Sequence, residues 1–242
     1  MKKCYFALCL GLLVFLFGCV SSAKATLVNQ QDSIALVSVV SNGDINWKDE
    51  GPIEPGSVGP IAKRMMSRDP DLAVISKADE LIATAEEIFR NSMADAKLIN
   101  LADKQTVLGS RAYREAKIDR QQLVRDFVKP DEYLFLDYLD KKFPPALAAE
   151  TGIQRTMYLS FDFTKMTSFG VGKLLGNLRV SVEMTVLILD NRGKKIFKKT
   201  YIVGDGDTIK VSNGVYSESE LMNLLDLAIN DVCDDFLDDL RK

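Results

Sequence analysis

An alternating run of apolar and polar residues, followed by a turn and a second β-rich run, constrains this chain more than any other feature. From Leu178 to Ile188 the apolar residues stand at every second position, with mostly polar residues between them. A period of two places the apolar side chains on one face of a strand and the polar ones on the other. Asp190-Asn191-Arg192-Gly193 has turn chemistry, and residues 196–203 return as a β-rich run. Residues 178–203 therefore predict a hairpin with one face on a core.

Three further segments predict strands around this hairpin. Residues 33–41 (SIALVSVVS) are rich in β-branched residues and predict a buried first strand. Residues 157–163 alternate apolar and polar side chains, which is typical of a half-buried strand. Residues 167–177 are Gly-rich and predict a loose connection into the hairpin, and residues 208–211 predict an edge strand after it. The pattern favours a largely antiparallel sheet.

The end of the chain predicts a long amphipathic helix. Ser217-x-x-Glu220 is a capping box that satisfies free backbone N–H groups at a helix start. Behind it runs an apolar stripe at helical spacing, which should pack across the hairpin: Leu221, Leu224, Leu225, Ala228, Ile229, Val232, Cys233, Phe236, Leu237 and Leu240. We expect the aspartates outside this stripe to form a solvated face rather than a metal site: Asp226, Asp231, Asp234, Asp235, Asp238 and Asp239.

A second amphipathic helix is predicted from Ser76, where Ser76-x-x-Asp79 is a variant capping box. Its apolar face is formed by Leu81, Ile82, Ala85, Ile88, Phe89, Met93 and Ala96. The opposite face is predicted to be solvated and carries Glu80, Glu86, Glu87 and Arg90. The two helices and the sheet predict an α+β fold.

The middle of the chain is less regular. Gly109 weakens a helix prediction for residues 106–117, and Asp119 caps a short helix predicted to bear Leu123, Val124, Phe127 and Val128. Residues 131–140 are apolar and aromatic, and their periodicity leaves strand and helix open. Pro144-Pro145 predicts the start of a helix at residues 146–151 that ends at Gly152.

The N-terminus predicts export. Lys2 and Lys3 precede an apolar run of about a dozen residues, which is the pattern of a signal peptide, here residues 1–18. Leu16-Phe17-Gly18-Cys19 resembles the lipobox of bacterial lipoproteins, which predicts lipidation of Cys19 and a tether over residues 19–32. Ala23-Lys24-Ala25 offers the alternative of ordinary cleavage and a soluble product. Residues 33–242 then form one predicted globular domain.

The absence of histidine and the presence of a single free cysteine after processing limit the kinds of catalytic and metal sites that this chain can form. Histidine is absent, which removes Ser-His-Asp and Cys-His catalysis and His-based zinc sites. After processing, Cys233 has no partner for a disulfide and is predicted to be a core thiol. Gly170-Val171-Gly172-Lys173 departs from a phosphate loop because Leu174 follows the lysine. We therefore predict no catalytic residue, cofactor or metal, and the mildly acidic balance argues against nucleic acid.

One loop offers a candidate partner-binding surface. Residues 42–60 hold four glycines, three prolines and the only tryptophan, and loops of this length are often functional. Trp47, together with Asp49 and Glu50, would form a recognition lip on this loop. The alternative is that Trp47 folds back over the sheet edge, because a large apolar side chain more often covers core.

The order of the predicted elements resembles the small α/β domain of Gram-negative envelope lipoproteins, such as the curli-secretion lipoprotein and the lipoprotein activators of penicillin-binding proteins. Three stretches carry the resemblance: Leu147-Ala148-Ala149-Glu150-Thr151-Gly152 before the Met157 strand, Asp190-Asn191-Arg192-Gly193-Lys194 at the hairpin, and the last helix. The resemblance implies a lipid-anchored protein, expected at the outer membrane and facing the periplasm.

Two classes of function follow. The first is a non-enzymatic lipoprotein that docks on envelope proteins through its loops or sheet edge. The alternative is a carboxylate-dependent hydrolase, since carboxylates alone can serve as acid and base, or a carrier of lipids or small ligands. The missing catalytic constellation favours the first class.

Overall fold

The computed structural model describes residues 33–48, 78–124, 127–171, 175–204 and 206–242. The signal peptide, Cys19, the tether and most of the loop that follows Trp47 lie outside these ranges. No helix in the described ranges is long and apolar enough to cross a bilayer.

The described residues form one mixed sheet of seven strands, in the order β3-β1-β4-β5-β6. Short strand β2 pairs with β4, and β7 pairs with β5. The strands β1 and β2 run parallel to β4, while the remaining pairs are antiparallel. The strand bounds are β1 Ile34–Asn42, β2 Asn46–Trp47, β3 Phe127–Val128, β4 Arg155–Val171, β5 Leu175–Asp190, β6 Lys195–Gly204 and β7 Ile209–Ser212.

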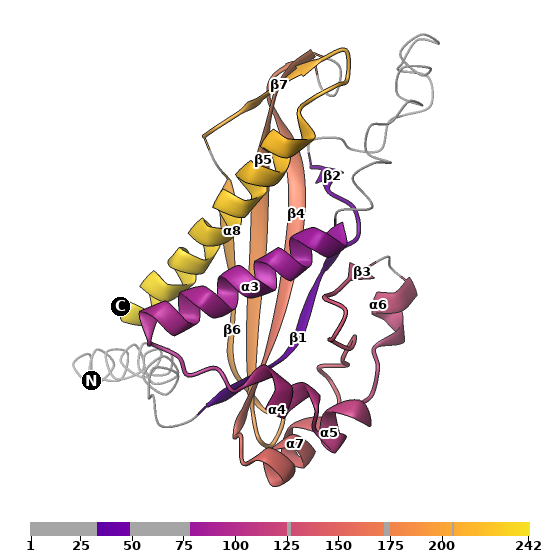
Figure 1. Ribbon diagram of the computed structural model, residues 1–242, viewed down its shortest axis with the longest axis vertical. Helices are drawn as coiled ribbons and strands as arrows, with labels where there is room; N and C mark the ends of the chain where they lie inside the picture. Colours follow the sequence, from indigo (N-terminus) through magenta and orange to yellow (C-terminus); the bar gives the residue numbers. More distant parts are fainter. Residues whose placement is uncertain (1–32, 49–77, 125–126, 172–174, 205) are drawn as a thin grey trace, which may run out of the picture.

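The predicted hairpin is confirmed as strands β5 and β6, which lie side by side in Figure 1. Its turn is built by Asp190, whose Oδ1 accepts hydrogen bonds of 2.9 Å from the backbone N–H groups of Arg192 and Lys194. Gly193 adopts φ 71°, in the left-handed region that glycine enters at no steric cost. The Asp and Gly residues that predicted the turn therefore also stabilise it.

The prediction of a loose connection over residues 167–177 is wrong. Strand β4 continues to Val171 and β5 begins at Leu175, so the two strands form a long second hairpin. Gly170 pairs with Gly176, and Asn177 also pairs with Lys210 of β7. Glycine weakens a strand but does not prevent its backbone from pairing, and here β4 and β7 supply partners on both sides of β5.

Two helices cover one face of the sheet (Figure 1). Helix α3 spans Ala78–Ala96 and helix α8 spans Glu218–Arg241; the Ser217 Oγ accepts the Glu220 N–H as the capping box predicted. The apolar stripe of α8 packs on β5, β6 and α3, and the Phe89 and Phe236 rings stack with their centres 6.0 Å apart. The predicted packing of the closing helix across the hairpin is confirmed.

Shorter elements gather on the opposite face, beside β1. Helices α4 (Lys104–Leu108) and α5 (Arg111–Arg114) divide the segment that the sequence left ambiguous. They meet at Gly109, where a Cβ would lie 2.6 Å from the Gln105 carbonyl oxygen. Helix α7 spans Phe143–Thr151, so it begins three residues before the predicted start, and its predicted end at Gly152, at φ 77°, is confirmed.

Two predictions in this region need correction. Helix α6 is confined to Arg120–Val124, because Phe127 and Val128 form β3 and pair with Asn42 and Ser41 of β1. Residues 131–140 form neither a strand nor a helix; they are irregular. Their contacts include an isolated bridge between Ile118 and Leu136 and a 2.8 Å hydrogen bond from the Leu134 N–H to the Tyr113 hydroxyl. In both cases long-range pairing decided the conformation of a short apolar run.

Candidate functional site

The structure places Trp47 against the edge of the sheet. Trp47 pairs with Lys165 of β4, and its half-buried side chain packs on the core. The Lys165 Nζ lies 5.5 Å from the centre of the Trp47 ring and 5.4 Å from that of Tyr216, and it donates a 3.1 Å hydrogen bond to the Tyr216 hydroxyl. The indole therefore covers a fully buried cation. Asp49 and Glu50 lie outside the described residues, so their part in a recognition lip stays a prediction.

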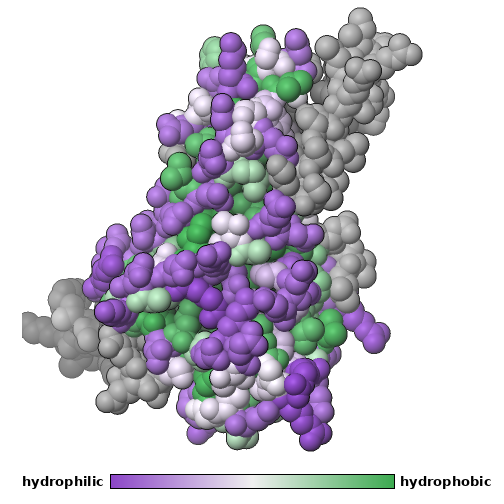
Figure 2. All heavy atoms as spheres, in the orientation of Figure 1, coloured by the Kyte–Doolittle hydropathy of each residue, from purple (hydrophilic) through white to green (hydrophobic). Residues whose placement is uncertain are grey.

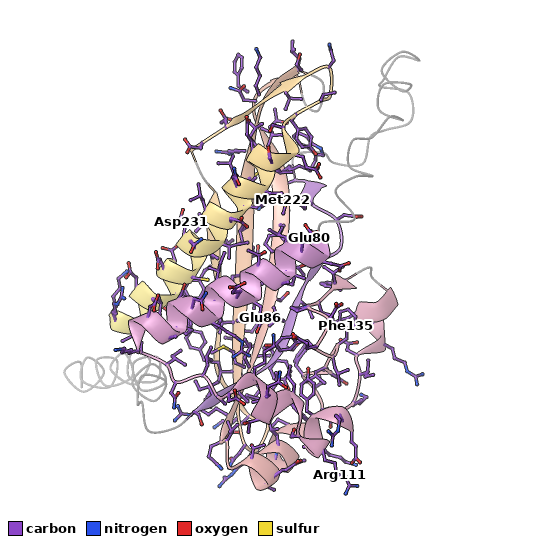
Figure 3. All side chains as sticks on the ribbon, in the orientation of Figure 1. Glu80, Glu86, Arg111, Phe135, Met222 and Asp231 are labelled. Atoms are coloured by element: carbon purple, nitrogen blue, oxygen red, sulfur yellow. The ribbon has the colours of Figure 1, made fainter. Side chains whose placement is uncertain are left out.

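A buried polar cluster lies where the sequence predicted a solvated helix face. Glu86 is only 5% exposed, and its carboxylate accepts hydrogen bonds from Arg90 Nε, from Lys104 Nζ at 2.8 Å and from the Tyr133 hydroxyl at 2.8 Å. Figure 3 shows Glu86 between α3 and the short elements beside β1. Burial opposes ionisation of Glu86, but these donors outweigh it and lower the pKa of the carboxyl. The prediction that Glu86 is solvated is wrong.

The sequence contained a signal for this burial. Position 86 follows Ile82 by four residues and precedes Phe89 by three, so it lies on the apolar stripe of α3. Asp239 likewise lies on the apolar stripe of α8, because it follows Val232 by seven residues and Phe236 by three. Asp239 is buried rather than solvated, and it accepts the Tyr201 hydroxyl and pairs with Lys199, each at 2.9 Å.

Two carboxylates stand directly opposite one another on β4 and β5. Asp162 pairs with Glu183 in the antiparallel register, so their side chains project from the same face of the sheet. Burial and then the Glu183 charge raise the pKa of Asp162, with Lys48 opposing them. No group of three or more metal-binding side chains was found in the described ranges.

The cleft lies on the face of the sheet opposite α3 and α8. It has a volume of about 500 Å³, within the range of small-ligand sites. The sheet supplies one wall, and the segment that contains Phe127, Leu136, Tyr138 and Leu139 supplies the other. The full lining is Ser38, Val40, Gln122, Phe127, Leu136, Tyr138, Leu139, Tyr158, Leu159, Ser160, Thr185, Leu187, Leu189, Gly193, Lys195 and Lys198.

A second exposed apolar feature is the hairpin tip, which we define as Phe169, Leu175 and Val215. These side chains are 78%, 57% and 66% exposed. Strands β4, β5 and β7 bring them to one end of the molecule, and Figure 2 shows apolar surface at this end among hydrophilic atoms. The sequence did not predict either the tip or the cleft, because both depend on which strands become neighbours.

The chain was compared with protein-family models, curated proteins and solved structures. No protein-family model matches the chain, and the search of curated proteins found no match. Among solved structures, the chain is similar to the LpoB C-terminal domain from Salmonella enterica, with a TM-score of 0.31 and 13% sequence identity. The similarity covers 78% of this chain and 97% of that chain. A likeness at this level does not bear on function.

Proposed function

We propose that the chain is a membrane-anchored bacterial envelope lipoprotein that acts as a non-enzymatic docking module for another envelope protein. Leu16-Phe17-Gly18-Cys19 supports the anchor, because a cysteine at the end of a signal peptide is the acceptor of the lipid. Lipidation at Cys19 leaves the folded part of the chain tethered by residues 19–32. A docking surface must then be sought on the folded part.

The hairpin tip carries this proposal. A single exposed apolar side chain is ordinary, but several at the end of one projecting element mark an interaction site. Phe169 and Leu175 are held at fixed places by the β4–β5 register, and Val215 is held by its bridge to Ser212. The tip therefore presents its side chains without a large ordering cost upon binding.

The chemistry around the tip favours a protein partner over a lipid surface. Lys210 is exposed on β7, where it pairs with Asn177, and Glu220 is exposed at the start of α8, five residues after Val215. The described exposed charges near the tip are therefore of mixed sign. Surface binding to an anionic bilayer would favour an excess of Lys and Arg around apolar side chains. We infer a partner with an apolar groove that receives Phe169, surrounded by polar groups.

The experiment is site-specific photo-cross-linking of the full chain in intact cells. A photoreactive amino acid replaces Phe169 in one variant and Leu227 in the other. Leu227 is the matched control, because it is also a large exposed apolar residue (53%) but lies on α8. We expect a discrete protein adduct from position 169 and none of that mass from position 227.

The outcomes separate the alternatives. Introducing Leu175→Asp into the variant that carries the probe at position 169 should reduce the adduct by about tenfold, because a charge would be buried at the contact. Cross-links from position 169 to lipid alone would indicate a membrane-inserting tip. Equal adducts from both positions, or none from position 169, would reject the tip as the docking surface.

A further inference from the structure

The part of the cleft that lies over β4 and β5 offers a ligand no free backbone groups for strand pairing, although β6 pairs only with β5 among the described strands. The sheet wall of the cleft comes from β1, β4, β5 and β6, and within that wall β4 and β5 are paired on both sides. An extended peptide usually gains affinity by adding a strand to a free sheet edge, which the interior of this face does not offer. A ligand that is not a peptide, and so has no backbone N–H and C=O groups to satisfy, does not need a free sheet edge.

The lining is mostly apolar, with a few polar atoms. Phe127, Leu136 and Leu139 form the wall away from the sheet, and Leu139 is 70% exposed. Tyr158 lies at the sheet wall with 7% of its side chain exposed, and burial raises the pKa of its hydroxyl, which therefore remains a neutral donor. Neither this hydroxyl nor the buried Gln122 Oε1 makes a hydrogen bond of normal geometry to a described residue, although the Thr156 hydroxyl is a neighbour of Tyr158.

The charges that line the cleft have one sign. Lys195 and Lys198 are exposed on β6 and are the charged members of the described lining. Two acids outside the lining, Asp137 and Asp140, contribute to the raised pKa of Tyr158. Asp137 is paired with Lys117, which offsets its charge. Asp162 and Glu183 also project from this face, each two residues from a lining residue (Ser160 and Thr185), but they lie outside the lining itself. The cleft lining therefore carries positive charge on β6, beside an apolar floor.

We propose that this cleft binds a long-chain carboxylate, with the acyl chain between the sheet and Leu139 and the carboxylate at Lys195 and Lys198. An acyl chain brings no polar groups that would need partners inside the cleft. Covering Leu139 and Tyr138 removes exposed apolar surface from water, and the two ammonium groups hold the anion. This binding activity goes beyond protein docking and uses residues that the hairpin tip does not contain.

The test uses the full chain reconstituted in phosphatidylcholine vesicles and a dodecanoate that carries a photoreactive diazirine. Adducts are mapped by mass spectrometry, and the probe concentration at half-maximal labelling is compared between variants. Unlabelled dodecanoate and dodecanol serve as competitors. We expect labelled peptides from the cleft lining, and stronger competition by the carboxylate than by the alcohol.

Two variants test whether the carboxylate is held by the lysines of β6. The double variant Lys195→Gln with Lys198→Gln should raise the half-maximal concentration by about tenfold, which is the combined effect of two exposed ion pairs. Lys210→Gln is the matched control, because Lys210 is an exposed lysine on β7, and it should leave labelling unchanged.

Specific results would overturn the proposal. Labelling confined to the hairpin tip would place the acyl site elsewhere. An unchanged half-maximal concentration in the double lysine variant, or equal competition by dodecanol, would remove the role of the anion. Thermal unfolding of each variant shows that it is folded, so a loss of labelling in a folded lysine variant reports on the cleft itself.

Discussion

Glu86 is the residue whose environment departs most from its sequence context. A buried carboxylate is costly unless hydrogen-bond donors replace the lost water, and here the cations Arg90 and Lys104 and the neutral Tyr133 hydroxyl supply them. Lys104 also pairs with Glu132 at 2.7 Å, so the cluster joins α3 to the irregular segment before α7. Glu86 therefore connects the two faces of the fold near β1.

We predict that Glu86→Gln lowers the free energy of unfolding by about 2–3 kcal/mol at pH 7, because it leaves two cations facing a neutral amide. The folded-state pKa of Glu86 is lowered below its usual 4.5, so its contribution is present above that value and is lost as the pH falls through the folded-state pKa. Denaturant unfolding at pH 7 and pH 3 should show a difference between wild type and variant that shrinks in acid.

Glu87→Gln is the matched control for this prediction. Glu87 is the next residue on α3 and is exposed, so its replacement should change stability by less than about 0.5 kcal/mol. Equal effects of the two substitutions would show that the cluster contributes nothing specific.

Cys233 confirms the prediction of a core thiol, since it is fully buried in the apolar stripe of α8. Burial, followed by the charge of Asp234, raises the pKa of its thiol to about 12. Because the thiolate is the reactive form, we predict that Cys233 reacts with a maleimide at pH 8 on the order of a thousandfold more slowly in the folded than in the denatured protein. Peptide mass mapping of the labelled site measures this ratio, and comparable rates in both states would contradict the burial of α8.

At the scale of elements, α8 contributes more buried residues to the fold than α3, the other long helix. Four of its buried side chains, Leu225, Ile229, Val232 and Phe236, would each contribute roughly 2 kcal/mol of burial before conformational entropy is subtracted. A domain of this size is stable by only about 5–15 kcal/mol. The helix is therefore expected to be indispensable for folding.

We predict that truncation after Ser217 and the substitution Ile229→Asp both abolish cooperative thermal unfolding of the purified protein. Truncation exposes the sheet face beneath α8, and Ile229→Asp places an unpaired charge at a fully buried position. Asp235→Asn, on the exposed face of the same helix, should unfold within a few degrees of wild type. A truncated protein with a wild-type transition would instead identify α8 as a separate arm.

At the scale of the whole molecule, the central prediction concerns the anchor. If Cys19 is lipidated, the native protein should partition into the detergent phase and carry acyl chains visible by mass spectrometry. Cys19→Ala should make the protein soluble or leave its signal peptide uncleaved. A mature protein that begins at Thr26 without an acyl group would establish the alternative cleavage after Ala25.

The sequence by itself determined the elements whose identity depends on local spacing. The alternation of β5, the Asp190 turn, the Ser217 cap and the apolar stripe of α8 each specify a backbone conformation within one segment. Such patterns act through the dihedral preferences and side-chain direction of neighbouring residues, which need no distant partner. For that reason the α+β class and the main hairpin were predictable.

Only the tertiary structure decided the features that depend on distant partners. Phe127 became a strand residue because β1 lay beside it, and Glu86 and Asp239 became buried because Lys104, Tyr133, Tyr201 and Lys199 came from elsewhere in the chain. The cleft and the hairpin tip likewise exist because strands far apart in sequence became neighbours. A polar group is buried when remote donors offset its desolvation, and that free energy is set by the packed molecule rather than by local spacing.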